Sequence, residues 1–201
     1  ILSIHIISQV GYMIMGLGLY TVWGLAGSIL HIVHNMVVKT GLFLFEGATE
    51  EITGTGELKK MGGLLSKYPW LGWGFLAASM SLAGVPPLSG FFSKFVLLKA
   101  SVEAGNYWIM AAALITGFFT LFSMVKIFFY TFWGEPKPLP EKAASINYAK
   151  LLPSCFVLVL VSVGLGVASQ PVLDVVLRAA NQLMNPEIYI NAVMAVPGIR
   201  G

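Results

Sequence analysis

The chain alternates between long apolar stretches and shorter polar segments, and several apolar stretches are long enough to cross a membrane. A transmembrane helix needs about 20 mostly apolar residues. Residues 1–20 and 24–48 meet this requirement early in the chain, and residues 106–132 and 150–168 meet it later. The pattern predicts an all-α fold, namely a polytopic bundle of transmembrane helices.

The segment from Tyr68 to Lys99 is too long for one plain span, and the run AGVPPLSG at Ala83–Gly90 interrupts it. Proline removes backbone donors, and glycine loosens the chain. At membrane depth such a break is tolerated only where protein or water satisfies the backbone. We therefore predict a Pro/Gly-broken helix: one helix, a break that faces a cavity, and a second helix.

Two polar segments lie between the spans. Residues 49–67 contain three Glu, three Lys and several Gly, and Gly134–Lys150 contains Lys and Pro. Both are predicted to be loops in water or at the membrane surface. Basic residues favour the cytoplasmic side, so both loops are expected there only if an even number of crossings separates them. A broken helix that crosses once satisfies this condition and gives five crossings, whereas two crossings give six and place the loops on opposite sides.

These spans predict one transmembrane domain over residues 1–168, with five or six helices. The chain opens at Ile1 inside an apolar stretch, so we expect the domain to be incomplete at its N-terminus. Residues 169–201 are expected to form an amphipathic and irregular tail. Within it, Val172–Leu183 carries Asp174 and Arg178 among apolar residues, which is typical of a helix at the membrane interface.

Composition supports a membrane setting, because 57% of the residues are hydrophobic and only 10% are charged, against roughly 25% in soluble domains. The net charge is +3, and the basic residues are scattered rather than gathered in a stripe, which argues against nucleic acid as a partner. The single cysteine, Cys155, lies in apolar sequence, and no metal-binding or cofactor-binding motif is present. We expect no metal and no cofactor.

Ionisable residues in the middle of the second span give the strongest indication of function. His31, Asn35 and Lys39 are four residues apart and share one helix face about 12 Å long, and His34 lies on its flank. A central Lys costs about 2.5 to 3.5 kcal/mol on insertion scales. Imidazole changes its charge near neutral pH, so this face predicts a proton relay. The alternative is that Lys39 reaches an interface while the histidines only make helix contacts.

Lys94, beside Ser93, follows the predicted break directly. A broken helix offers free carbonyls and room for water. A lysine there can be hydrated in one protonation state and desolvated in the other, which suits a transport step. The alternative is that Lys94 only anchors a helix end.

Weaker signals come from the first span and from residues 106–132. Together with Asn35 of the second span and Ser93 beside Lys94, they define a possible further polar track, made of His5, Asn35, Ser93, Thr116, Thr120, Ser123 and Lys126. Membrane-embedded Ser and Thr often bond only to their own backbone. His5 shares its face with Ser8, Gln9 and Tyr12, and packing is the favoured interpretation of that face.

Three segments resemble one known family, and the resemblance covers nearly the whole chain. It is the proton-conducting antiporter family, which includes the large membrane-arm subunits of respiratory complex I and the Mrp-type sodium/proton antiporter subunits. The segments are IISQVGY at Ile6–Tyr12, HNMVVKTGLF at His34–Phe43 and SLAGVPPLSGFFSK at Ser81–Lys94. The resemblance implies the second repeat of the antiporter-like complex I subunit fold.

The resemblance also implies roles for individual residues. Lys39 matches the lysine of the family's central hydrophilic axis, His31 matches a histidine of that axis, and Lys94 matches the lysine of the C-terminal broken helix. Relatives often carry a histidine four residues before the axial lysine, where this chain has Asn35 and places His34 beside it. The implied route runs through His31, Lys39 and bound water to Lys94.

The implied function is proton translocation in a multisubunit sodium/proton antiporter of a bacterial or archaeal cell membrane. The expected partners are the other subunits, the lipid bilayer, protons and Na⁺, and the chain is expected to be a secondary-transporter subunit rather than an enzyme. One alternative is a proton-pumping membrane-arm subunit of an NADH:quinone oxidoreductase-like redox complex. Another is a scaffold that only packs partner subunits.

Overall fold

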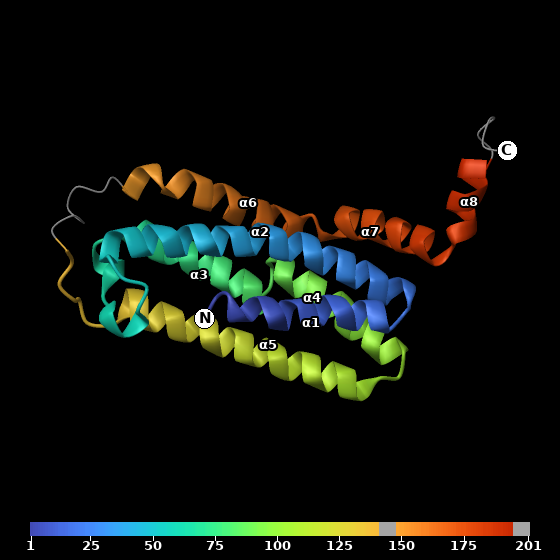
Figure 1. Ribbon diagram of the computed structural model, residues 1–201, viewed down its shortest axis with the longest axis horizontal. Coiled ribbons are helices and arrows are strands. Elements are labelled where there is room, and N and C mark those ends of the chain that lie inside the picture. Colours follow the sequence, from blue (N-terminus) through green and yellow to red (C-terminus); the bar gives the residue numbers. More distant parts are fainter. Residues whose placement is uncertain (141–147, 195–201) are drawn as a thin grey trace.

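The computed structural model describes residues 1–140 and 148–194, and within these ranges the chain forms helices and no strand. The predicted all-α bundle is confirmed (Figure 1). The α-helices are α1 (Ile4–Gly18), α2 (Val22–Thr53), α3 (Pro69–Ala83), α4 (Ser89–Glu103), α5 (Tyr107–Phe128), α6 (Leu152–Val167), α7 (Ser169–Met184) and α8 (Pro186–Met194). Short turns complete the path: η1 (Leu58–Lys60), η2 (Leu64–Ser66), the π-turn η3 (Phe129–Trp133) and η5 (Tyr148–Lys150).

The central element is α2, whose 32 residues extend over about 48 Å. It packs against α1, α3, α4, α6 and α7. Thr21 caps its start by accepting the Gly24 N–H at 3.0 Å, and Gly54, with φ +69°, ends it. The predicted loop at 49–53 was therefore wrong. These residues continue the helix because the Thr49 and Thr53 hydroxyls bond within it, and the chain leaves the helix only at Gly54.

The predicted helix–break–helix arrangement is confirmed by α3 and α4. Each has 15 residues, and Figure 1 shows them end to end beside α2, so together they follow one discontinuous path. Gly84, with φ +94°, ends α3 in a left-handed conformation that favours glycine. The Pro86–Pro87 peptide bond is cis.

The described parts of the two Lys-containing segments, residues 54–67 and residues 134–140 with 148–150, lie together at one end of the bundle (Figure 1). Lys137 donates a hydrogen bond to the carbonyl of Lys59. The rings of Tyr68 and Tyr148 pack edge to face with centroids 4.9 Å apart. Because both segments occupy the same end, the broken helix counts as a single crossing. The arrangement therefore has the even number of crossings that one-sided basic loops require.

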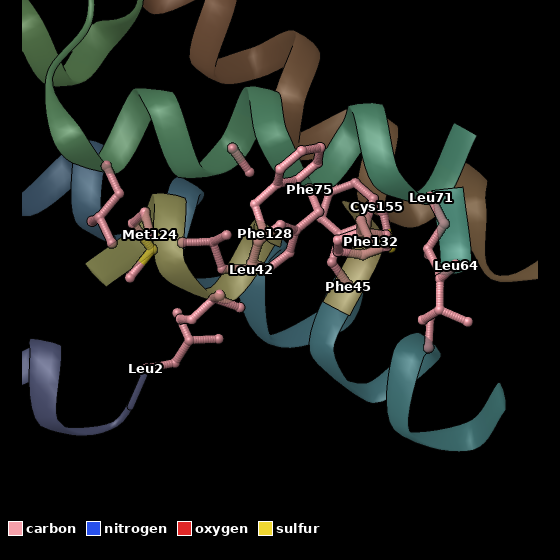
Figure 2. Close-up of a cluster of buried hydrophobic side chains, with 14 of the residues drawn as sticks. Leu2, Leu42, Phe45, Leu64, Leu71, Phe75, Met124, Phe128, Phe132 and Cys155 are labelled. Carbon is pink, nitrogen blue, oxygen red and sulfur yellow. The ribbon is translucent and has the colours of Figure 1, made fainter. Parts of the chain in front are cut away.

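An aromatic and aliphatic core fills the bundle next to these segments. The ring of Phe75 lies 6.5 Å from that of Phe45 and 5.3 Å from that of Phe132. Figure 2 shows these rings in one cluster with Phe128 and Cys155. The thiol of Cys155 is free and buried in this core. The core fixes α2, α3, α5 and α6 relative to one another.

Residues 169–194 are more regular than predicted. α7 follows α6 and buries Val176 and Ala180 against a patch that contains Leu25, Leu30 and Val96, while Asp174 and Arg178 stay exposed. A helix thus covers the predicted amphipathic segment, and its place at the membrane interface stays a prediction. Residues 186–194 were expected to be irregular but form α8, because a proline fits the first position of a helix. The predicted irregular tail around Pro197 lies outside the described residues.

Three helical segments of the described chain are long and apolar enough to cross a membrane alone. They are Val22–Thr53, Tyr107–Trp133 and Tyr148–Val167. α1 is apolar but shorter, and α3 and α4 reach the required length only as a pair. The bundle therefore presents the helices of a multi-pass membrane protein.

Candidate functional site

The predicted histidines of α2 face α4, and each bonds to a serine there. The Nδ1 atom of His31 lies 3.0 Å from Ser93 Oγ, and the Nδ1 atom of His34 lies 2.8 Å from Ser89 Oγ. Ser89 and Ser93 are one turn apart, so a single face of α4 meets both histidines. The two imidazole centroids are 5.7 Å apart, and both side chains are buried. The site therefore begins as two neighbouring His–Ser pairs.

The pair at His34 continues into two further helices. Ser89 Oγ lies 2.9 Å from Ser162 Oγ of α6, and Ser162 Oγ lies 2.7 Å from Ser81 Oγ of α3. Four helices thus meet in one hydrogen-bonded group. Sequence reasoning missed this group because its members are separated by 73 and 81 positions along the chain.

Lys94 interacts with the end of α3 that the break exposes. Its Nζ donates to the carbonyls of Leu82 and Ala83 at 2.9 and 3.0 Å. The last carbonyls of a helix have no intrahelical partner and carry the negative end of the helix dipole, so they stabilise a cation. The break thus provides acceptors for Lys94.

Lys39 is also buried, with 9% of its surface exposed. Its Nζ donates to the carbonyl of Leu2 at 2.8 Å. Its amine is therefore held by a backbone carbonyl inside the bundle. Among the salt bridges of the described residues, none involves Lys39 or Lys94.

Tyr12 connects these groups, although its helix face was interpreted as packing. Its ring centroid lies 5.1 Å from that of His31 and 5.2 Å from Nζ of Lys94. Its hydroxyl donates to the carbonyl of Ala113 in α5. A cation over an aromatic face is stabilised by the ring. Tyr12 therefore belongs to the site.

A cavity of about 300 Å³ borders Lys94. It lies between α1, α4 and α5, and its lining is mostly apolar. The break residues Ala83, Gly84 and Val85 form part of its wall, as the sequence predicts for a break in a membrane helix. A smaller cavity, of about 100 Å³, lies near the basic loops and is lined by Leu2, whose carbonyl accepts from Lys39.

The hydrogen bonds of the other predicted polar residues do not connect them to this cluster. The amide of Asn35 donates to the carbonyl of His31 on its own helix. Thr116 and Thr120 donate to carbonyls of α5. Ser123 and His5 are half-buried, and Lys126 is exposed.

Three buried polar atoms of α2 have no hydrogen-bond partner among the described residues. They are Nε2 of His31, Nε2 of His34 and Oδ1 of Asn35. Each histidine thus bonds to a serine through one nitrogen, while its other nitrogen has no partner in the described part of the chain. No group of three metal-ligating side chains occurs in the part of the chain that the structure describes. The chemistry available here is proton transfer between imidazole, hydroxyl and amine groups.

Comparison with known proteins identifies the family. A sequence profile described as "NADH:quinone oxidoreductase/Mrp antiporter, TM" matches residues 2–120. The chain belongs to this family. It is 54% identical over 194 residues to the D-type subunit of the Na(+)/H(+) antiporter from Alkalihalophilus pseudofirmus, covering 96% of this chain and 39% of that protein.

Two solved structures share the fold of this family member. A chain of the Mrp complex from Dietzia sp. is similar with a TM-score of 0.85 and 31% identity, over 96% of this chain and 44% of that one. A chain of respiratory complex I from Thermus thermophilus is similar with a TM-score of 0.69 and 28% identity, over 89% of this chain and 38% of that one. The chain spans about two fifths of the length of the curated relatives it matches.

Within the family, four segments predict a likeness to the D-type subunit of the Mrp antiporter, and the named relatives confirm it. The segments are Leu58–Leu64, Thr120–Lys126, Phe132–Gly134 and Asn185–Ile190. The likeness to the Mrp complex agrees with this assignment. This family member therefore has the membrane helices and the antiporter-like complex I subunit fold predicted from its sequence.

Proposed function

We propose that this chain carries protons through the membrane as part of a multisubunit Na⁺/H⁺ antiporter. One observation carries the proposal: Lys94 is buried at a helix break, bonded to two free carbonyls and bordered by a cavity. Carbonyls accept hydrogen bonds from a protonated amine, and the cavity gives water access to it. Lys94 can then exist in both protonation states, as a transport step requires.

The route proposed through the site starts at Lys39 and ends at Lys94. Water connects Lys39 to the two histidines, because Asn35 cannot take up a proton and its amide is bonded within α2. His31 and His34 exchange protons at their unpartnered Nε2 atoms. Tyr12 contacts both His31 and Lys94, and so keeps the last transfer within one cluster.

Coupling between the two lysines is electrostatic in this proposal. Like charges repel strongly where the surroundings are weakly polarisable. A proton that arrives at Lys39 therefore favours release from Lys94. The partners are the remaining subunits of the complex, the exchanged cation is Na⁺, and the chain acts as a secondary-transporter subunit in the cell membrane rather than as an enzyme.

A second candidate function is favoured by the likeness to respiratory complex I. In that case the same proton path serves a redox-driven pump whose electron chemistry lies in other subunits. Gene neighbours separate the two functions. Genes for redox and quinone-binding subunits beside this one support the pump, and genes for six small membrane subunits support the antiporter.

The test is sodium-dependent proton movement in inverted vesicles that carry the full-length complex. Lys39→Ala and Lys94→Ala are each expected to abolish exchange at equal assembly, because each removes a proton carrier that water alone replaces poorly. Lys60→Ala is the matched control, since Lys60 is exposed and pairs only with its neighbour Glu57 at 2.8 Å. If both Lys39→Ala and Lys94→Ala retained wild-type exchange, the proposed function would be wrong and the chain would be a scaffold that only packs partner subunits.

A further inference from the structure

Three buried serines from three helices meet beside His34. Ser81, Ser89 and Ser162 are exposed by only 1%, 3% and 2%. Their oxygens form a chain from the imidazole: Nδ1 of His34 to Ser89 at 2.8 Å, Ser89 to Ser162 at 2.9 Å, and Ser162 to Ser81 at 2.7 Å. Ser81 and Ser89 also approach to 3.5 Å. Each hydroxyl has a single O–H to donate, so the direction of one hydrogen bond in such a chain affects the direction of the next.

Two donor patterns satisfy this chain. If Nδ1 of His34 carries no proton, Ser89 donates to it, Ser162 donates to Ser89, and Ser81 donates to Ser162. If Nδ1 is protonated, it donates to Ser89, and every bond along the chain reverses. A hydroxyl rotates to donate in either direction, so both states of His34 keep their partners. Ser162 is the middle member of the chain, and the direction in which it donates differs between the two states.

The remaining nitrogen of His34 faces the broken helix. A Cβ at Gly90 would lie 3.0 Å from Nε2 of His34, so the backbone of α4 passes close to this atom. Nε2 has no protein partner in the described part of the chain. The two nitrogens thus have different surroundings: Nδ1 meets the serine chain, and Nε2 has no partner there. Because a neutral imidazole carries its proton on only one nitrogen, Nε2 can take up a proton only while Nδ1 already holds one and donates to Ser89.

The position of Ser162 is fixed by α6. Gly166, one turn further along α6, lies directly against the break, and a Cβ there would overlap the carbonyl oxygen of Pro87 and approach Leu88 C to 2.9 Å. α6 therefore contacts the break at Gly166. Ser162 bonds to Ser81 before the break and to Ser89 after it. Ser162 connects the geometry of the broken helix to the donor pattern at His34.

We infer that Ser162 is a positioning residue for proton transfer at His34, because it accepts from Ser89 in the donor pattern in which Nδ1 is protonated, the pattern that allows Nε2 to take up a proton. This inference rests on the proposed proton path. It assigns Ser162 no proton of its own to transport, since the three serines bond to one another and Ser162 is buried. Its role is to make both states of His34 possible in a buried site.

Few ionisable side chains lie near His34, and this makes the pH dependence of proton exchange an informative test. His31 lies on the same helix, Lys94 comes from α4, and Tyr12 comes from α1 and contacts both. The sequence of α3 contains no ionisable side chain, and that of α6 contains only Cys155. α7, which also packs on α2, carries Asp174 and Arg178 on its exposed face.

Three variants of the full-length complex test the inference in inverted vesicles. In Ser162→Ala, the hydroxyl of Ser89 loses its acceptor at 2.9 Å in the state in which Nδ1 is protonated, and only Ser81 at 3.5 Å remains to it in the serine group. That state becomes harder to reach, so the pH of half-maximal exchange is expected to move to more acidic values and the rate near neutral pH to fall about five- to tenfold. Ser162→Thr keeps the hydroxyl and is expected to retain the wild-type pH profile. Ser154→Ala is the control, because Ser154 is exposed on the same helix and donates to the nearby carbonyl of Leu151.

The pH profile separates positioning from packing. A purely structural role lowers the rate or the amount of complex without moving the profile, and an unmoved profile in Ser162→Ala overturns the inference. If Ser162→Ala does not assemble, Ser81→Ala gives the same test, since it removes the acceptor at the end of the chain and is expected to shift the profile in the same direction. Loss of exchange in Lys94→Ala together with a wild-type profile in Ser162→Ala sinks only this inference, whereas retained exchange in Lys94→Ala sinks the proposed function.

Discussion

At the scale of single residues, Gly90 lies where the second half of the broken helix meets α2. A Cβ at this position would overlap the carbonyl oxygen of Ser81 and lie within 3.0 Å of the His34 ring. These neighbours are a backbone atom and a hydrogen-bonded ring, so neither can yield without moving the site. Only glycine allows α3, α4 and His34 to approach this closely.

Gly90→Ala is therefore expected to damage the site directly. Overpacking a close contact costs about 1 to 3 kcal/mol, and here the displaced groups include a proposed proton carrier. We expect lower thermal stability of the purified complex and loss of most sodium-dependent proton exchange. Gly11→Ala, in α1, is the control, because a Cβ there meets nothing within 4 Å. Equal exchange in the two variants would contradict the close contact.

The residues of the site differ in how far the sequence could predict them. His31, His34 and Lys39 stand out because ionisable groups are costly within a span and fall on one face of a helix. Tyr12 was harder to recognise, because a tyrosine in an apolar helix is compatible with ordinary packing. Ser162 gave no signal, since its partners come from other helices and serine is common in membrane helices. The spacing of residues in the sequence predicts contacts along one helix but not contacts between helices.

At the scale of elements, α6 differs from an ordinary lipid-facing helix in how it meets the break. Gly166 lies against the backbone of Pro87 and Leu88, whereas Gly164, two residues earlier, has nothing within 4 Å of a built Cβ. An added Cβ would therefore clash at Gly166 and find open space at Gly164.

Gly166→Ala is expected to push α6 away from the break and to destabilise the protein by about 1 to 3 kcal/mol. Gly164→Ala is expected to be neutral or stabilising by up to about 1 kcal/mol, because alanine favours a helix more than glycine does. Thermal unfolding of the two purified variants in the same detergent compares them directly. Similar melting temperatures of the two variants would show that the close contact between α6 and the break does not limit substitution at Gly166.

Helix ends were the least predictable elements. The apolar run in α2 ends near Ala48, yet the helix continues to Thr53, since polar residues tolerate a helix and only Gly54 stops it. α8 shows the same effect at the other end of the chain, where a prolyl start was interpreted as irregular. By contrast, the break between α3 and α4 was predictable because Pro and Gly remove specific backbone options.

At the scale of the whole molecule, the end-to-end arrangement of α3 and α4 determines which side each loop occupies. One discontinuous crossing followed by α5 returns the chain to the side it left, so the segments around Lys60 and Lys150 share one side. The edge-to-face contact between Tyr68 and Tyr148 agrees with this arrangement. Asn106, at the start of α5, marks the opposite end. Because basic loops favour the cytoplasm, the shared side is expected to be cytoplasmic.

Single-cysteine labelling of the full-length complex tests this arrangement. In a Cys155→Ser background, cysteines introduced by Lys60→Cys and Lys150→Cys are expected to react with a membrane-impermeant maleimide in inverted vesicles and to be protected in intact cells. Asn106→Cys is expected to show the reverse pattern. All three positions are exposed, so a difference in labelling reports the side of the membrane rather than burial. Labelling of positions 60 and 150 from opposite sides would mean that the broken helix crosses twice, and the carbonyls that hold Lys94 would then no longer lie within a single crossing.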